Sequence, residues 1–274
     1  MLRFAVAGCP HSTPKPGGTV EGLKRAKKLG ITAMEIEWVQ NVPKDPARMA
    51  EIRKTAEELD ITLTVHAPYY VNLNSPDETT LSESKKRIIA ALSMGELAGV
   101  RSVCVHAAFN LKQSPEVVYA NVSAAVEDIL QHKAKLFPHV NLGIETMGKA
   151  AQFGTLEECL KMSKEYAQYP VLDPAHMHAR FAGAWNTAAE WNDMFDQYQR
   201  VLGKKALKNV HMHYSGIEYG PHGEKRHLPL RQSDANWKDF LRVLKEREIE
   251  GTVVCESPLL EEDTLLLQRE FATI

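Results

Sequence analysis

The sequence has few cysteines, and no two of them lie close together. The four cysteines, Cys9, Cys104, Cys159 and Cys255, are widely spaced, and none forms a Cys-x-x-Cys pair. A disulfide framework or a cysteine-rich zinc module would need closely spaced cysteines, so neither is expected. This usage is typical of a protein of the reducing cytoplasm.

Long apolar runs and an excess of one charge are also absent. The apolar runs are only a few residues long, so we expect no membrane-spanning helix, and Met1–Ala7 is too short for a signal peptide core. Lys and Arg number 33 against 35 Asp and Glu, a net charge of −2. This balance does not indicate a nucleic-acid binder, although only the potential over the binding face decides that. No Gly-x-Gly-x-x-Gly follows the first expected strand, so a dinucleotide site is not predicted.

What the 274 residues do contain is a repeated alternation of amphipathic stretches and short β-rich runs. Such runs after amphipathic helices indicate parallel strands with crossover helices. We expect strands near residues 3–7, 33–37, 62–66, 102–106, 141–145, 171–173, 209–213 and 252–256. We expect helices near 19–29, 46–59, 82–98, 114–136, 156–167, 187–202, 236–247 and 259–270. Eight such units predict an α/β fold, a single (β/α)₈ TIM barrel over residues 1–274.

Metal-ligand residue types stand at the ends of six expected strands. They are His66, His106, Glu145, Asp173 with His176 after it, His211 with His213 after it, and Glu256. The carboxyl ends of parallel barrel strands meet on one rim, so these side chains are expected in one mouth. Any one of them alone would be a hydrogen-bonded or helix-capping residue. Together, with no Lys or Arg at the strand ends to pair with the acids, they predict a cation site for zinc or manganese.

Several segments resemble the endonuclease IV family of apurinic/apyrimidinic endonucleases, within the xylose-isomerase-like barrel superfamily. The matching segments are His66–Leu73, Val105-His106, Gly143–Thr146, Asp173–His176 and Cys255–Pro258. Together they extend over nearly the whole chain. The segments His211–Tyr219 and Gly223–Leu230 resemble an archaeal-type branch of that family.

The resemblance implies a centre of three zinc ions, with manganese as the alternative metal. One zinc would take His66, His106 and Glu145. The second would share Glu145 and add Asp173, His211 and Glu256. The third would take His176 and two ligands from the excursion 215–236, where the family has an Asp and a His separated by one residue.

The third site departs from the family pattern, because Lys225 stands two residues before His227. We therefore expect Glu224 and His227 to complete it. A replacement by His213 or His222, or a centre of only two ions, stays open.

The resemblance also implies hydrolysis of the phosphodiester 5′ to abasic sites in DNA, a step of base excision repair. A hydroxide held between two cations bridged by Glu145 would attack, with Glu145 or Glu256 orienting it. Tyr69, Tyr70 and Asn72 are the expected DNA contacts, although both tyrosines can equally pack beneath their loop. The segment Trp38–Pro43 lacks the basic residue that the family inserts into DNA. A monomer is expected.

Two other functions stay open. A sugar isomerase or epimerase of the same superfamily would hold one divalent metal on Glu145, Asp173, His211 and Glu256, and it would not need His66, His106 and His176. A metal-bearing barrel that binds DNA or a partner without turnover is the third possibility. The departure at Lys225 and the missing basic residue after the second strand leave that possibility open.

Overall fold

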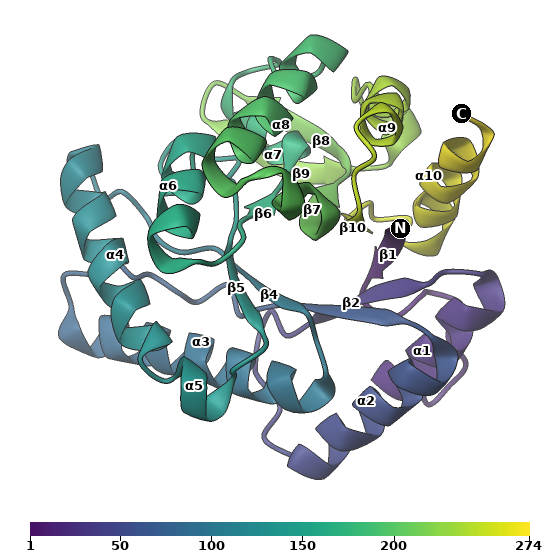
Figure 1. The fold of residues 1–274 in the computed structure, drawn as a ribbon, viewed down its shortest axis with the longest axis horizontal. Helices are drawn as coiled ribbons and strands as arrows, with labels where there is room; N and C mark the ends of the chain where they lie inside the picture. The colour runs from purple at the N-terminus through teal and green to yellow at the C-terminus, as the bar shows by residue number, and fades with distance from the viewer.

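The computed structural model describes residues 1–274, and its central feature is a sheet of eight parallel strands (Figure 1). The strands are β1 (Leu2–Ala7), β2 (Ala33–Glu37), β3 (Thr62–His66), β4 (Ser102–Val105), β5 (Asn141–Ile144), β6 (Val171–Leu172), β7 (Val210–Tyr214) and β10 (Gly251–Cys255). Their order is β5-β4-β3-β2-β1-β10-β7-β6. A parallel bridge between Glu145 and Val171 joins the two end strands and closes the barrel. The predicted TIM-barrel fold is confirmed.

Helices surround the barrel on its outside, except the short α7, which lies at the barrel mouth (Figure 1). They are α1 (Thr19–Leu29), α2 (Pro46–Leu59), α3 (Glu78–Ala98), α4 (Pro115–Leu130), α5 (Lys133–Leu136), α6 (Leu156–Tyr166), α7 (Pro174–Arg180), α8 (Ala188–Leu202), α9 (Trp237–Glu246) and α10 (Glu261–Thr273), with short 3₁₀ turns at Lys204–Lys208 and Leu230–Gln232. None of them is long and apolar enough to cross a membrane.

Local capping explains where the helices depart from the expected boundaries. Helix α3 begins earlier than expected because the Asp77 carboxylate accepts the Thr80 backbone N–H at 2.7 Å. The expected helix 114–136 is two helices, α4 and the short α5. Helix α7 was not expected; Asp173 caps its first turn by accepting the His176 N–H at 2.9 Å.

The alternation of side chains along the strands separates the apolar core from the chemistry. On β2, Met34 and Ile36 belong to the core that packs beneath the helices. The alternate residues Glu35 and Glu37 must then face the barrel interior, because successive side chains of a strand point to opposite faces. On β7 the same alternation buries Met212 in the outer core and turns its two flanking histidines inward.

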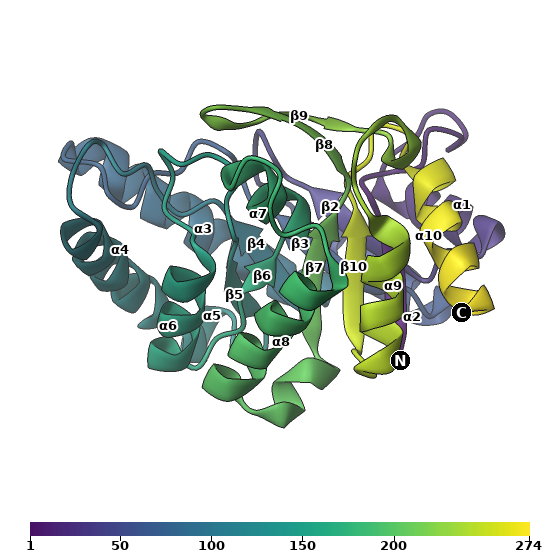
Figure 2. The ribbon, with the colours of Figure 1, turned by 90° about the horizontal axis from the view of Figure 1, so that it is seen from above.

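The excursion after β7 forms an antiparallel hairpin of β8 (Gly216–Gly220) and β9 (Gly223–Leu228). Figure 2 shows this hairpin lying across the end of the barrel opposite the N-terminus. Its turn sits on the loop after β5, where the Glu224 N–H donates to the Gly148 carbonyl at 3.0 Å. A Cβ at Gly223 would lie 2.1 Å from that carbonyl oxygen, so this approach requires glycine. The excursion that was expected to supply two metal ligands is therefore a structured hairpin at the barrel mouth.

Candidate metal centre

A first group of ligand atoms comes from the ends of β3, β4 and β5 and consists of His66, His106 and Glu145. The two Nε2 atoms lie 3.2 Å apart, His106 Nε2 lies 2.7 Å from Glu145 Oε2, and His66 Nε2 lies 3.8 Å from it. Tetrahedral zinc with bonds of about 2.0–2.1 Å holds its ligand atoms about 3.3 Å apart. His66 Nδ1 donates to the Ala67 carbonyl at 2.8 Å, which directs Nε2 to this point. The donor set fits one cation.

A second group shares Glu145 and consists of Glu145, Asp173, His213 and Glu256. His213 Nδ1 lies 3.1 Å from Glu145 Oε1 and 3.3 Å from Glu256 Oε2. Asp173 Oδ2 and Glu256 Oε2 are buried and accept no hydrogen bond. Buried carboxylate oxygens without a donor are costly unless a cation neutralises them, so this group also fits a metal.

The histidine of the second group is His213, and the expected placement of His211 there is corrected. Both side chains point inward because they are two residues apart on β7, but the strand continues to Tyr214 and carries His213 to the rim. His211 lies one layer deeper in the barrel, where its Nε2 is 2.9 Å from Glu35 Oε2.

A third group, formed by His176, Glu224 and His227, brings helix α7 and the hairpin together. Glu224 Oε2 lies 3.6 Å from His176 Nε2, and Glu224 Oε1 lies 3.9 Å from His227 Nε2. The Nδ1 atoms of both histidines donate to backbone carbonyls, each at 3.1 Å, which leaves Nε2 facing Glu224. Lys225 lies on the other side of β9 and pairs with Glu218 at 3.4 Å, and His222 is exposed in the turn.

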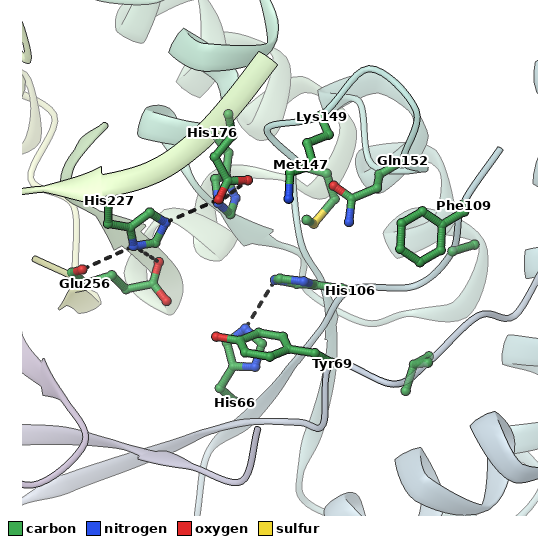
Figure 3. A pocket seen from close by; sticks show the side chains of 13 residues that line it. His66, Tyr69, His106, Phe109, Met147, Lys149, Gln152, His176, His227 and Glu256 are labelled. Carbon is green, nitrogen blue, oxygen red and sulfur yellow. Dashed lines mark hydrogen bonds and ion pairs between the residues drawn. The ribbon is translucent and has the colours of Figure 1, made fainter. Parts of the chain in front are cut away.

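The three groups line or underlie one pocket of about 450 Å³ (Figure 3). Tyr69 lines this pocket, with its ring centroid 4.9 Å from that of His66 and 5.3 Å from that of His106. Tyr70 is 70% exposed and is absent from the pocket lining. Neither tyrosine is packed beneath the loop. Asn72, in contrast, accepts the backbone N–H groups of Asn74 and Phe109, so it fastens two rim loops together.

Acidic groups dominate the electrostatics of the centre. Burial would raise the pKa of Glu256, but the charge on His213 outweighs it and lowers this pKa to about 2. Burial would lower the pKa of His66, but the nearby carboxylates of Glu145 and Glu37 outweigh it and raise this pKa to about 9. The metal-free site therefore takes up protons where a cation would otherwise neutralise the acids.

Sequence reasoning missed one buried acid, one half-buried acid and the far wall of the pocket. Glu35 is fully buried, and burial raises the pKa of Glu37 to about 8. The signal was present, because two glutamates interrupt an apolar strand that is covered on both faces in a barrel. The far wall is formed by Phe109, Met147, Lys149 and Gln152 (Figure 3). These residues lie on irregular loops, and no sequence period marks them.

Comparison with known proteins shows the family to which this barrel belongs. Residues 23–271 match the model of the family described as Xylose isomerase-like TIM barrel. The chain belongs to this family. An uncharacterized protein of Methanocaldococcus jannaschii, MJ0133, is 38% identical over 98% of this chain and 96% of its own length. A probable endonuclease 4 of Aquifex aeolicus is 24% identical, with 84% of each chain covered. The predicted resemblance to endonuclease IV is thereby confirmed.

Solved structures with the same fold carry out more than one kind of chemistry. Endonuclease IV from Thermus thermophilus superposes with a TM-score of 0.77 at 22% identity, covering 99% of this chain and 98% of that one. A D-tagatose 3-epimerase-like protein gives a TM-score of 0.72 at 16% identity, covering 99% and 97%. At these identities the likeness shows the fold, and the function has to be argued from the site.

Proposed function

We propose that this protein is a metal-dependent phosphodiesterase that hydrolyses DNA on the 5′ side of abasic sites. The observation that carries the proposal is the convergence of three ligand groups on one pocket, two of which share Glu145. A neighbouring pair of cations suits displacement at phosphorus, since both the attacking and the leaving oxygen need stabilisation. The relatives named as endonuclease 4 support the same class of substrate.

The residues present fit zinc as the resident metal, with manganese as the alternative. Imidazole nitrogens and carboxylate oxygens are present in all three groups and are donors that zinc takes in catalytic sites. The thiol of Cys104 also lies beside the first group, where it donates to Glu145 Oε2 at 3.1 Å. Asp173 Oδ2 and Glu256 Oε2 accept no hydrogen bond, and each lies beside a buried imidazole nitrogen, His176 Nδ1 at 3.2 Å and His213 Nδ1 at 3.3 Å. When bound, the ions supply Lewis-acid activation of water and of the phosphate oxygens.

Each part of the chain has a distinct task in this proposal. Glu145 directs Oε2 to the first group and Oε1 to the second, so one side chain holds both in register. Glu256 lines the pocket as an ionised carboxylate and orients the attacking water. Lys149, on the opposite wall, offers a positive charge to the DNA phosphate. Tyr69 and the exposed Tyr70 stack against the nucleotides beside the lesion.

One observation favours a second candidate, a sugar epimerase with a single metal. The second group alone supplies four ligands, and a D-tagatose 3-epimerase-like protein shares the fold. A single-metal epimerase would not use the ligands of the first group or those of the third group. Buried and half-buried histidines and acids that serve no purpose would be a large cost in stability, so we favour the phosphodiesterase.

The test compares the two activities in one preparation. The zinc-loaded protein is incubated with a duplex that contains a single tetrahydrofuran abasic analogue, and with the same duplex without it. We expect a nick immediately 5′ to the analogue, none in the intact duplex, and loss of nicking with EDTA. Epimerisation of D-tagatose by the manganese-loaded protein without nicking would contradict the proposal. Binding of the abasic duplex without any product would contradict it too, and would indicate a non-catalytic barrel.

A further inference from the structure

Beneath the second group, a buried carboxylate lies between two histidines of the same strand. Glu35 is 0% exposed. Its Oε1 lies 2.9 Å from His213 Nε2, and its Oε2 lies 2.9 Å from His211 Nε2. Neither Glu35 nor His211 lines the pocket at the barrel mouth. The proposed hydrolysis assigns no task to either residue.

The two ring nitrogens of His213 face different groups. Nε2 lies 2.9 Å from Glu35 Oε1 in a charge contact without hydrogen-bond alignment, whereas Nδ1 hydrogen-bonds to Glu145 Oε1 at 3.1 Å and lies 3.3 Å from Glu256 Oε2. A neutral imidazole carries one N–H and one lone pair, and the partner of one nitrogen decides which nitrogen keeps the proton. With a cation in the second group, Nδ1 would give up its proton and coordinate, and the carboxylate beside Nε2 would keep the remaining proton on that nitrogen.

Glu35 is itself held in place from the other side. The Nε2–H of His211 donates to Oε2, so the carboxylate cannot rotate away from His213 without losing a buried hydrogen bond. The two oxygens of the buried carboxylate thus lie between the two imidazoles, 2.9 Å from a ring nitrogen of each.

We propose that Glu35 is a positioning residue that fixes His213 in the form with the proton on Nε2, and so sets the metal affinity of the second group. The inference rests on the proposed metal centre. The competing arrangement is a separate buried metal held by Glu35, His211 and His213, which are close enough to share an ion. That arrangement would occupy His213 Nε2 and leave its proton on Nδ1, facing Glu145.

The experiment measures zinc binding without DNA, by competition with a chromophoric chelator. Glu35→Gln keeps the size of the side chain and removes the charge. We expect it to weaken zinc binding about 10–100-fold, the usual effect of losing such an outer partner. His211→Gln is the matched control, because its amide N–H can still donate to Glu35, and we expect wild-type affinity. An equal loss in both variants would indicate a separate metal at Glu35 and overturn the proposal.

A second measurement, which needs no variant of Glu35, tests which ring nitrogen of His213 binds zinc. In the zinc-loaded wild-type protein with ¹⁵N-labelled histidine, NMR should show His213 bound through Nδ1 with a slowly exchanging proton on Nε2. The signal is assigned by its loss in His213→Asn. Coordination through Nε2 would overturn the inference whether or not DNA is nicked. Normal coordination without nicking would instead contradict only the proposed function, and a protein that binds no zinc would contradict both.

Discussion

At the scale of single residues, Glu145 is the side chain on which the proposed mechanism depends most. Its two oxygens face different ligand groups, 2.7 Å from His106 Nε2 and 3.1 Å from His213 Nδ1. Glu145→Gln keeps the volume of the side chain and removes the charge. We expect metal content to fall and nicking of an abasic duplex to drop by at least about 100-fold, because transition-state charge loses its support.

The control for that change is Glu190→Gln, at the capping box of α8. Its carboxylate accepts the Thr187 hydroxyl and the backbone N–H groups of Trp185, Asn186 and Thr187, far from the metal ligands, and glutamine is the other residue that a capping box uses. We expect unchanged metal content and nicking. Full activity and full metal content in Glu145→Gln would contradict the shared-ligand arrangement.

His106 separates the two enzymatic proposals. It belongs to the first group, which a single-metal epimerase would not need. We expect His106→Ala to lose about one zinc per chain by elemental analysis and to abolish nicking, since two neighbouring cations are required for the displacement. A variant that nicks the abasic duplex at the wild-type rate would remove His106 from the mechanism.

Glu37 gives a prediction for pH dependence in the metal-free protein. Burial raises the pKa of Glu37 from its ordinary 4.5 to about 8, so the folded state keeps this proton to higher pH than the unfolded chain does. The stability that Glu37 contributes is present below pH 4.5 and is lost as the pH rises to about 8. The melting temperature of Glu37→Gln, relative to that of the wild-type protein, should therefore rise as the pH increases over that range. A difference in Tm that does not change with pH would contradict this.

At the scale of elements, the β8–β9 hairpin decides whether the third group binds a metal. The hairpin carries Glu224 on its inner side and Glu218, which pairs with Lys225 and Arg226, on the other. We expect Glu224→Ala to lose one metal and to lower turnover far more than DNA affinity, because stabilising a leaving oxygen acts in the transition state.

Glu218→Ala on the same hairpin is the control, since exposed ion pairs contribute only about 0–1 kcal/mol. Its metal content and turnover should match wild type. If the two variants behave alike, Glu224 is a surface residue and the centre holds two metals at most.

The positions of the strands could be predicted more closely than the identity of the ligand residues at their ends. The β-rich runs and the acids and histidines that end them marked the rim correctly for His66 and Asp173. The choice between His211 and His213 could not be made, because a period of two places both on the inner face. The end of β7 determines which of the two histidines reaches the rim. The position of that end depends on how β7 pairs with β10 and β6.

At the scale of the whole molecule, the sequence predicts the closed barrel, because eight strand–helix units in one chain of this length have few other solutions. It could not predict which ligands share a cation. Glu145 reaches both His106 and His213 because, in the closed barrel, β5 lies next to β4 on one side and is separated from β7 only by β6 on the other. That distance is set by strand tilt and register, which no local pattern records.

The most direct test of the central claim is the number and position of bound ions, measured by anomalous diffraction at the zinc edge on crystals of the zinc-loaded protein. We predict three ions. One lies between His66, His106 and Glu145, one between Glu145, Asp173, His213 and Glu256, and one between His176, Glu224 and His227. A single ion on the second group, with His66 and His106 free of metal, would contradict the proposed three-metal centre and indicate the epimerase.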